Sequence, residues 1–256
     1  NIEDLLIGLE AVLPNGEIIR IKNNPRRSTG PDLRQLWIGA EGNFGIITEV
    51  TLKVFPKPED RWMQAYAFHE VRQGLTAIQQ FMQAGWKPAV VRLHDSFEAS
   101  QKYAKYLNKN EAILLLVSEG PEGYAQTEGQ ALDKIIQGNG GRPLGAEPVE
   151  IWFEHRNETG ALEKLTSRGM IVDTIEISAM WTDIANIYEQ VTKRLKEEIP
   201  ELLAISGHAS HAYMKAALII RSCFSCKEPT SISSLQPSRC KTHPKLTGYT
   251  GPFGAL

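Results

Sequence analysis

The 256-residue sequence is 42% hydrophobic and 23% charged, the composition of an ordinary globular protein with room for one large or two modest domains. Its formal net charge of −2 gives no basic surface for nucleic acid, so we expect no nucleic-acid partner. No apolar run approaches the roughly 20 residues that span a bilayer, which argues against an integral membrane protein. Without an initiator Met or a signal peptide, the sequence predicts a cytoplasmic fragment or processed chain.

The first part of the chain predicts short strands and turns. Residues 8–21 predict a hairpin, because apolar residues alternate with polar ones on both sides of a Pro-Asn-Gly-Glu turn, and Asn-Gly tolerates the positive φ of tight turns. Further along the chain, two prolines predict a domain boundary near residues 56–62. Between hairpin and boundary the sequence predicts a loop over 22–30, a short helix over 32–37 and an alternating strand over 46–54.

Beyond this boundary, helical and strand patterns alternate along the chain. This alternation is typical of an α/β or α+β domain in which helices cover a sheet. The predicted helices cover 69–84, 97–107, 124–137, 148–166 and 181–198, and the predicted strands cover 89–93, 112–118, 170–178, 202–210 and 213–220.

Three glycines, Gly39, Gly42 and Gly45, recur every third residue between the short helix and the strand at 46–54. Such spacing lets the backbone approach a ligand closely and expose its N–H groups, as suits a diphosphate or the polar edge of a flavin. A tight turn that needs positive φ explains the same three glycines equally well.

The longer string DLRQLWIGAEGNFGIITE, at residues 32–49, resembles a segment of the FAD-linked oxidases of the vanillyl-alcohol-oxidase type. In that family the segment ends the FAD-binding domain, and its glycines and isoleucines pack against the cofactor. The resemblance spans residues 1–58 and implies FAD as cofactor, while the family's pyrophosphate loop would lie upstream of this chain. The implied cofactor-binding residues are Gly39, Glu41, Gly42, Gly45, Ile46 and Ile47.

The resemblance also implies the fold class and the domains. We expect an α+β protein made of the end of a vanillyl-alcohol-oxidase type FAD-binding domain, residues 1–58, and a ferredoxin-like α/β cap domain that binds substrate, residues 59–220. Within the cap, PAVVRLHD at 88–95 and SGHASHAY at 206–213 are similar to two strands of the alkylglycerone-phosphate synthase branch. That branch implies ether lipid biosynthesis, with Tyr213, Arg92, His208 and His211 as catalytic residues and Arg156 and Thr174 at the substrate phosphate.

The implied roles fit the chemistry of these side chains. Tyr213 would act as the acid/base next to a carbonyl, for which its phenol, with an ordinary pKa near 10, must be poised by neighbours. Arg156 offers a planar fork to phosphate oxygens, and the Thr174 hydroxyl adds a donor. Structural explanations stay open: Arg92 as an ion pair with Asp95 or a helix carboxylate, the histidines as surface or core residues, and Arg156 as a solvated helix residue.

Residues 221–256 differ in composition from the rest. They contain all three cysteines, and five Lys/Arg against one Glu give them a charge of +4. Cys223-x-x-Cys226 and Cys240-x-x-His243 have the spacing of a zinc site. However, the family resemblance stops near Met214, so we interpret this segment as an aberrant, disordered tail from a reading-frame or gene-model change, and we predict no metal site.

Three functions stay open from the sequence. The first is an FAD-dependent enzyme similar to alkylglycerone-phosphate synthase, and the second an FAD-dependent 2-hydroxy-acid dehydrogenase or oxidase of the glycolate or D-lactate type. The third is a non-catalytic zinc-binding or interaction module. For either enzyme we expect a small-molecule substrate; a lipid substrate implies peripheral membrane contact, and a homodimer is left open.

Overall fold

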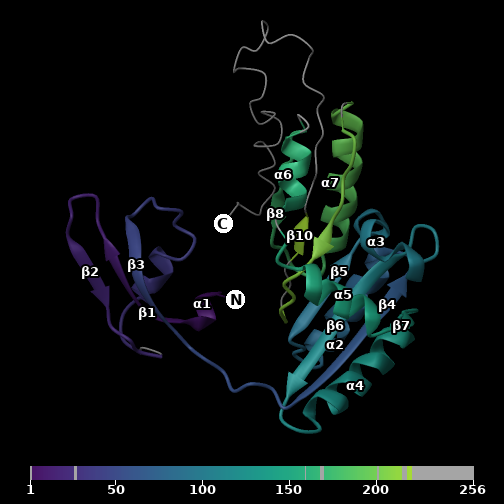
Figure 1. Ribbon diagram of the computed structural model, residues 1–256, viewed down its shortest axis with the longest axis horizontal. Helices are drawn as coiled ribbons and strands as arrows, with labels where there is room; N and C mark the ends of the chain where they lie inside the picture. The colour runs from purple at the N-terminus through teal and green to yellow at the C-terminus, as the bar shows by residue number, and fades with distance from the viewer. Residues whose placement is uncertain are drawn as a thin grey trace, which may run out of the picture. The chain divides into compact units, whose positions relative to one another are not determined.

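The computed structural model describes residues 2–25, 28–158, 160–167, 170–200, 202–214 and 218–220, so the predicted tail at 221–256 and its zinc-like motif lie outside the described residues. The chain divides into two compact units, Asn1–Pro58 and Glu59–Leu256 (Figure 1). Within the described ranges, no helix combines the length and apolar character needed to cross a membrane.

The first unit is built on a three-stranded antiparallel sheet of order β2-β1-β3. The predicted hairpin is confirmed: β1 pairs with β2, and Leu13 N–H donates to the Glu17 carbonyl across the turn (2.9 Å). Gly16 takes a φ of 83° there, which explains why the turn uses glycine. The elements of this unit are α1 (Ile2–Leu5), β1 (Leu6–Val12), β2 (Ile18–Ile21), the 3₁₀-helix η1 (Leu33–Leu36) and β3 (Ile46–Leu52).

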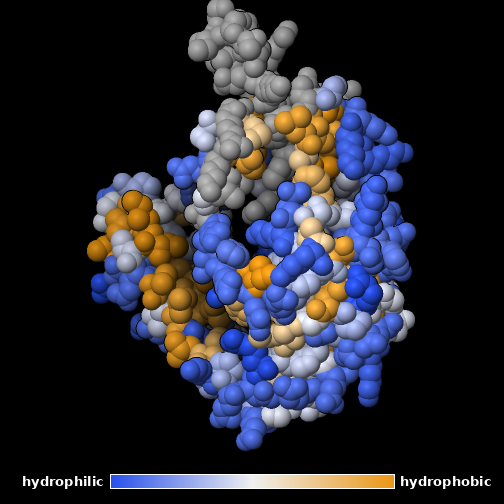
Figure 2. All heavy atoms as spheres, turned by 45° about the vertical axis from the view of Figure 1, so that its right-hand side comes forward, coloured by the Kyte–Doolittle hydropathy of each residue, from blue (hydrophilic) through white to orange (hydrophobic). Residues whose placement is uncertain are grey.

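The strand predicted over residues 46–54 is confirmed as β3, but neither of its faces is buried within this unit. The small core of this unit gathers around β1 and η1, where Leu6, Leu9 and Trp37 are buried. In contrast, six of the seven β3 residues are exposed, and Ile46 is 72% exposed. Figure 2 shows the resulting hydrophobic surface in orange on this unit. The alternation of β3 therefore does not correspond to a buried face within the unit.

The second unit contains a seven-stranded sheet of order β7-β4-β6-β5-β9-β10-β8, in which the paired strands run antiparallel. Its first four strands and two helices follow the chain as β-α-β-β-α-β, and their spatial order β7-β4-β6-β5 is that of a ferredoxin-like unit. The predicted α+β fold with a ferredoxin-like domain is thus confirmed. These elements are β4 (Asp60–Phe68), α2 (Val71–Gln83), β5 (Val90–His94), β6 (Ala112–Gly120), α4 (Tyr124–Gly138) and β7 (Arg142–Gly145).

Helices cover both faces of this sheet, and the central strand β6 is buried on both. Its residues Ala112, Leu114 and Leu116 belong to the core that includes α2, α4 and α7 (Ile184–Glu198). The intervening residues 113, 115 and 117 pack with α3 (Ser96–Tyr103) and α5 (Glu147–His155) on the other face (Figure 1). A strand covered on both faces gives a continuous apolar run, which is how residues 112–118 could be predicted.

Several predicted elements differ from the structure in extent. Strand β4 was not predicted because its second half is buried on both faces and shows no alternation. The predicted helix 148–166 is two helices, interrupted by a turn at residues 156–157. The helix predicted to residue 107 ends in the 3₁₀-helix η2 (Ala104–Tyr106). The other elements whose bounds differ from the prediction are α6 (Gly160–Thr166), β8 (Ile175–Ile177), β9 (His208–Ala209) and β10 (Leu218–Ile220).

Two glycines of α4 allow a matched test of packing on one helix. A Cβ at Gly129 would collide with the Trp62 indole, whereas a Cβ at Gly138 would meet nothing within 4 Å. We expect Gly129→Ala to lower the free energy of unfolding by about 1–3 kcal/mol through overpacking. We expect Gly138→Ala to leave it unchanged or raise it by up to about 1 kcal/mol, because alanine favours the helix. Urea unfolding followed by circular dichroism checks both, and equal shifts would contradict the packing.

Candidate functional site

Three neighbouring elements of the second unit place polar side chains on one face of the sheet. Arg92 and His94 are two residues apart on β5, so their side chains point to the same face. His94 lies directly opposite His208 of β9 in the antiparallel register. Helix α3 follows β5 at once and carries Glu98 in its first turn. The fold thereby gathers four polar residues.

The start of α3 is held by Asp95, which is the N-cap of the helix. Its side chain accepts a hydrogen bond from Glu98 N–H (2.9 Å). It also accepts from the Tyr188 hydroxyl of α7 (2.9 Å) and from Gly207 N–H beside β9 (2.5 Å). Burial raises the pKa of Asp95, and these three hydrogen bonds act in the opposite direction. Asp95 therefore ties α3, α7 and β9 together and directs Glu98 toward the two histidines.

Glu98 lies between the two imidazole rings. Its Oε1 is 2.9 Å from His94 Nδ1, and its Oε2 is 3.0 Å from His208 Nδ1. On the other side of the rings, Arg92 Nε donates to His94 Nε2, and Arg92 Nη2 lies at the same 3.3 Å distance from His208 Nε2. Both histidine side chains are 4% exposed. We call Arg92, His94, Glu98 and His208 the Arg92 cluster.

The environment determines the charges of this cluster at neutral pH. Burial lowers the pKa of His94, which favours its neutral form. Burial alone would raise the pKa of Glu98, but the hydrogen bonds from His208 and His94 outweigh it and hold that pKa well below its ordinary value. The cluster therefore combines an ionised Glu98 and a neutral His94 with the permanently charged Arg92. A guanidinium held in this way is suited to binding an anionic group.

Acid should weaken the fold through these groups. Because the pKa of His94 is lowered from 6.5, its protonation is disfavoured in the folded state, so stability falls as the pH drops below 6.5. The lowered pKa of Glu98 gives a second loss below its ordinary 4.5, partly offset by Asp95, whose raised pKa favours the folded state in acid. We expect His94→Gln to make the decrease in unfolding free energy between pH 7 and 5 smaller. The exposed His155→Gln should leave this decrease unchanged. Urea titrations at each pH measure this decrease, and equal slopes in both variants would contradict it.

His94, Glu98 and His208 are also within ligand distance for a metal ion, since their ligand atoms lie within 4.8 Å of one another. A cation at this position would stand close to the Arg92 guanidinium, whose positive charge opposes it. His208 Nδ1 forms a hydrogen bond with Glu98 (3.0 Å) and His94 Nε2 accepts one from Arg92 (3.3 Å), whereas His94 Nδ1 lies 2.9 Å from Glu98 without hydrogen-bond geometry. The geometry thus favours a hydrogen-bonded network over a metal site.

Of the predicted catalytic residues, the structure brings Arg92 and His208 into contact. His211 is largely exposed, with Nδ1 2.9 Å from the Ser210 hydroxyl, and its pKa is lowered by the burial of part of the ring and by the charge of Arg92. Tyr213 is 37% exposed, and its backbone carbonyl accepts from the Trp181 indole (3.1 Å). His208 lies in β9, which ends at Ala209, so His211 lies beyond this strand and the two histidines do not share one strand.

The two predicted phosphate ligands show other surroundings. Arg156 is exposed and its guanidinium lies over the rings of Trp152 and Phe153, at 5.5 and 5.2 Å from their centres. Thr174 is exposed, and its backbone N–H donates to the neighbouring Asp173 side chain. Their part in phosphate binding stays a prediction.

Sequence reasoning did not select His94 and Glu98, which complete the Arg92 cluster. A signal for them was present: Asp95-x-x-Glu98 directly after a strand has the spacing of a capping box and marks the helix start. His94 and Glu98, four residues apart across this start, approach each other to 2.9 Å. His208, however, is 110 residues away from Glu98, and its approach depends on the pairing of β5 with β9.

In the first unit, the predicted cofactor-binding residues fit the chemistry of a flavin nucleotide. Gly39 and Gly42 have φ values of 75° and 83°, and nothing lies within 4 Å of where their Cβ atoms would be. The turn thus requires glycine, which agrees with the tight-turn interpretation, and it leaves open space at the backbone; the contact of these glycines with a cofactor stays a prediction. Gly45 instead packs closely against the Val12 carbonyl. The remaining residues of this set are Glu41, with a φ of 48°, and the exposed Ile46 and Ile47.

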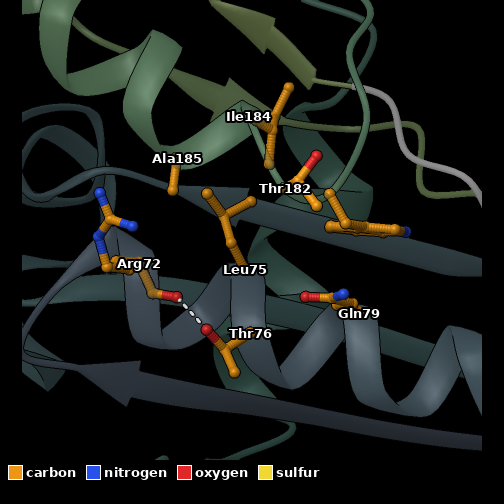
Figure 3. A pocket seen from close by; sticks show the side chains of 8 residues that line it. Arg72, Leu75, Thr76, Gln79, Thr182, Ile184 and Ala185 are labelled. Carbon is orange, nitrogen blue, oxygen red and sulfur yellow. Dashed lines mark hydrogen bonds between the residues drawn. The ribbon is translucent and has the colours of Figure 1, made fainter.

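A separate pocket of about 180 Å³ lies between α2 and the start of α7 (Figure 3). Arg72 lines it, but this guanidinium donates to Glu189 and Asn186. Thr76 donates to the Arg72 carbonyl within the helix, as the dashed line shows. None of the predicted site residues lines this pocket, and we place the candidate chemistry at the Arg92 cluster.

The chain is similar to known flavoproteins in sequence and in structure. An uncharacterized FAD-linked oxidoreductase of Escherichia coli, YgcU, is 33% identical over 222 residues, which cover 83% of this chain and 46% of that protein. Alkyldihydroxyacetonephosphate synthase of Caenorhabditis elegans is 25% identical, covering 77% of this chain and 38% of that protein. The chain therefore spans less than half the length of these curated relatives.

Glycolate oxidase subunit GlcD of Bacillus subtilis is 30% identical over 139 residues, 52% of this chain and 30% of that protein. A solved alkyldihydroxyacetonephosphate synthase shares the fold with a TM-score of 0.71 at 23% identity, over 89% of this chain and 47% of that one. The family of FAD linked oxidases, C-terminal domain, matches residues 57–234. Since this match covers more than half of the chain, the chain belongs to the FAD-linked oxidases through their C-terminal domain.

Proposed function

We propose that this chain supplies the substrate-binding cap (residues 59–220) and the end of the flavin-binding domain (residues 1–58) of an FAD-dependent oxidoreductase. The observation that carries this proposal is the Arg92 cluster, in which two buried imidazoles and Glu98 orient a guanidinium on the sheet. Such a group binds the anion of a small-molecule substrate, either a phosphate or a carboxylate. The chain belongs to a family of FAD-linked oxidases, which identifies FAD as the cofactor.

In this proposal the protein residues bind, orient and move protons, while the isoalloxazine of bound FAD supplies electron transfer. Arg92 binds the anionic group of the substrate, and Tyr213 exchanges a proton next to the carbonyl, assisted by His211. Arg156 and Thr174 add contacts to a phosphate. Gly39, Gly42 and the exposed Ile46 and Ile47 would hold the polar and apolar edges of the flavin nucleotide, as their open backbone and side chains permit.

We favour chemistry similar to that of alkylglycerone-phosphate synthase, acting on an acyl-ketone-phosphate. The similarity to the alkyldihydroxyacetonephosphate synthases over most of this chain supports this choice. A 2-hydroxy acid is the second candidate, because GlcD is 30% identical and a D-lactate dehydrogenase of Anaerostipes hadrus is 27% identical. Either substrate presents an anion to Arg92, so the cluster alone fits both.

Two measurements test the proposal in sequence. An absorbance spectrum between about 350 and 500 nm, before and after addition of FAD, tests whether the purified chain binds flavin; a folded chain that binds none would contradict cofactor binding by these residues alone. If FAD is bound, each substrate is added with an acceptor dye. Stoichiometric dye reduction by a 2-hydroxy acid identifies the dehydrogenase or oxidase, whereas conversion of an acyl-ketone-phosphate without dye reduction identifies the synthase-like reaction.

The setting of this activity is part of the proposal. We propose a cytoplasmic protein that contacts membranes peripherally if its substrate is a lipid of ether lipid biosynthesis, and that forms a homodimer. Fractionation of cells, co-sedimentation with phospholipid vesicles and light scattering of the purified chain test these three points separately. The rival zinc-binding module would be supported by stoichiometric zinc in the purified chain without bound flavin.

A further inference from the structure

The proton positions in the Arg92 cluster follow from what each group can donate. An ionised carboxylate accepts hydrogen bonds and donates none, so a nitrogen that binds it must carry a proton. Nδ1 of His208 forms such a hydrogen bond with Glu98 Oε2 (3.0 Å). Nδ1 of His94 lies 2.9 Å from Oε1 without the angle of a hydrogen bond, and its proton position follows from the other ring nitrogen, Nε2, which accepts from Arg92 Nε. A neutral imidazole carries a single N–H, so a proton on Nδ1 leaves Nε2 as an acceptor.

Arg92 lies on the accepting side of both rings. A guanidinium donates hydrogen bonds and accepts none, and Arg92 directs Nε and Nη2 at the two Nε2 atoms, each at 3.3 Å. The opposite tautomer would place an imidazole N–H against a guanidinium N–H and a lone pair against the carboxylate. One arrangement of protons therefore satisfies both the carboxylate and the guanidinium.

We infer that Glu98 is a positioning residue that sets His94 and His208 in the Nδ1–H tautomer, so that their two Nε2 lone pairs orient the Arg92 guanidinium for the phosphate or carboxylate of a substrate. The anionic substrate in this inference rests on the proposed function, whereas the tautomers belong to the chain alone. Burial supports the assignment, because both rings are 4% exposed and Glu98 is 20% exposed, so water competes little for these contacts.

The benefit to binding is orientation. Arginine on a strand has a long, flexible side chain, and ordering it at the moment of binding costs entropy. Two acceptors in fixed positions define the plane of the guanidinium before the anion arrives. Lysine could not replace it, because an ammonium lacks the planar fork that reaches two rings at once.

The test is a measurement of the histidine tautomers in the intact chain. We would label the chain with ¹⁵N-histidine and record long-range ¹H–¹⁵N spectra at neutral pH, with His94→Gln and His208→Gln assigning the two signals. A protonated and an unprotonated ring nitrogen have widely separated ¹⁵N shifts. We expect protonated Nδ1 and unprotonated Nε2 for both rings. An Nε2–H tautomer in either ring would overturn the inference.

Glu98→Gln gives the sharper comparison. The glutamine amide has one accepting oxygen and one donating nitrogen where glutamate has two acceptors. We therefore expect one of the two histidines to switch to the Nε2–H tautomer or to exchange between tautomers, whereas Glu154→Gln, at an exposed helix position, changes neither. Two unchanged rings in a folded Glu98→Gln protein would overturn the inference. If this variant does not fold, the wild-type tautomers decide the question.

Two further readouts separate this inference from its rivals. Addition of Zn²⁺ to the apo chain should leave both signals in place, and stoichiometric loss of both would identify a metal site and overturn the inference. In the FAD-loaded chain, Glu98→Gln should raise KM for the anionic substrate at least tenfold, with a smaller change in kcat. Expected tautomers without turnover of either substrate class would contradict the proposed function and still support the positioning of Arg92 by Glu98.

Discussion

Replacing Glu98 with alanine is expected to lower the free energy of unfolding of the second unit by about 3 kcal/mol. The substitution removes the acceptor of the buried His208 N–H and the carboxylate that lies 2.9 Å from His94 Nδ1, while it adds no new contact. A buried donor left without its partner costs about 1–3 kcal/mol. Urea unfolding followed by the circular dichroism of the intact chain measures the loss.

The control for this prediction is Glu154→Ala, on an exposed position of α5. A surface substitution of this kind changes stability by no more than about 0.5 kcal/mol. Equal midpoints for the two variants would mean that Glu98 contributes little to the fold, and the buried network could not be a stable feature of the site.

Replacing Arg92 with lysine is expected to lower kcat/KM of the FAD-loaded chain on the order of 100-fold for the substrate that it turns over. Lysine keeps the charge, but it loses the planar fork that contacts His94 and His208 together and binds two oxygens of an anion. The variant should remain folded, because lysine keeps a long side chain and a positive charge at this position. Steady-state kinetics with the acyl-ketone-phosphate or the 2-hydroxy acid measures the effect.

Arg61→Lys on β4 is the matched control for that experiment. Arg61 forms an ion pair with Glu119 of the neighbouring strand, and its side chain is 47% exposed. Exchanging arginine for lysine at this exposed pair should leave kcat/KM within about twofold of the wild-type value. If Arg92→Lys behaves like Arg61→Lys, Arg92 does not bind the substrate through its guanidinium fork, and the site must be sought elsewhere in the chain.

Parts of the site were predictable because they depend on local sequence. The segment at residues 32–49 indicated the flavin-linked family, and its glycines have the positive φ that their spacing suggested. PAVVRLHD at 88–95 pointed to Arg92 and ended in His94 and Asp95. Glu98 was missed because an isolated glutamate in an amphipathic helix resembles any solvated residue. Its importance comes from two histidines on other elements.

Local signals were sufficient for the hairpin turn at Gly16 and the buried run of β6, whereas the ferredoxin-like domain was implied by the family resemblance, since β4 and β7 were not predicted. Tertiary structure alone decided the rest. Pairing of β5 with β9 brings His208 to Glu98 across 110 residues. Because these groups are buried, the charge of the carboxylate and of the imidazoles then depends on the groups beside them. Periodicity reports which face of an element is apolar, but it does not specify which distant element covers that face.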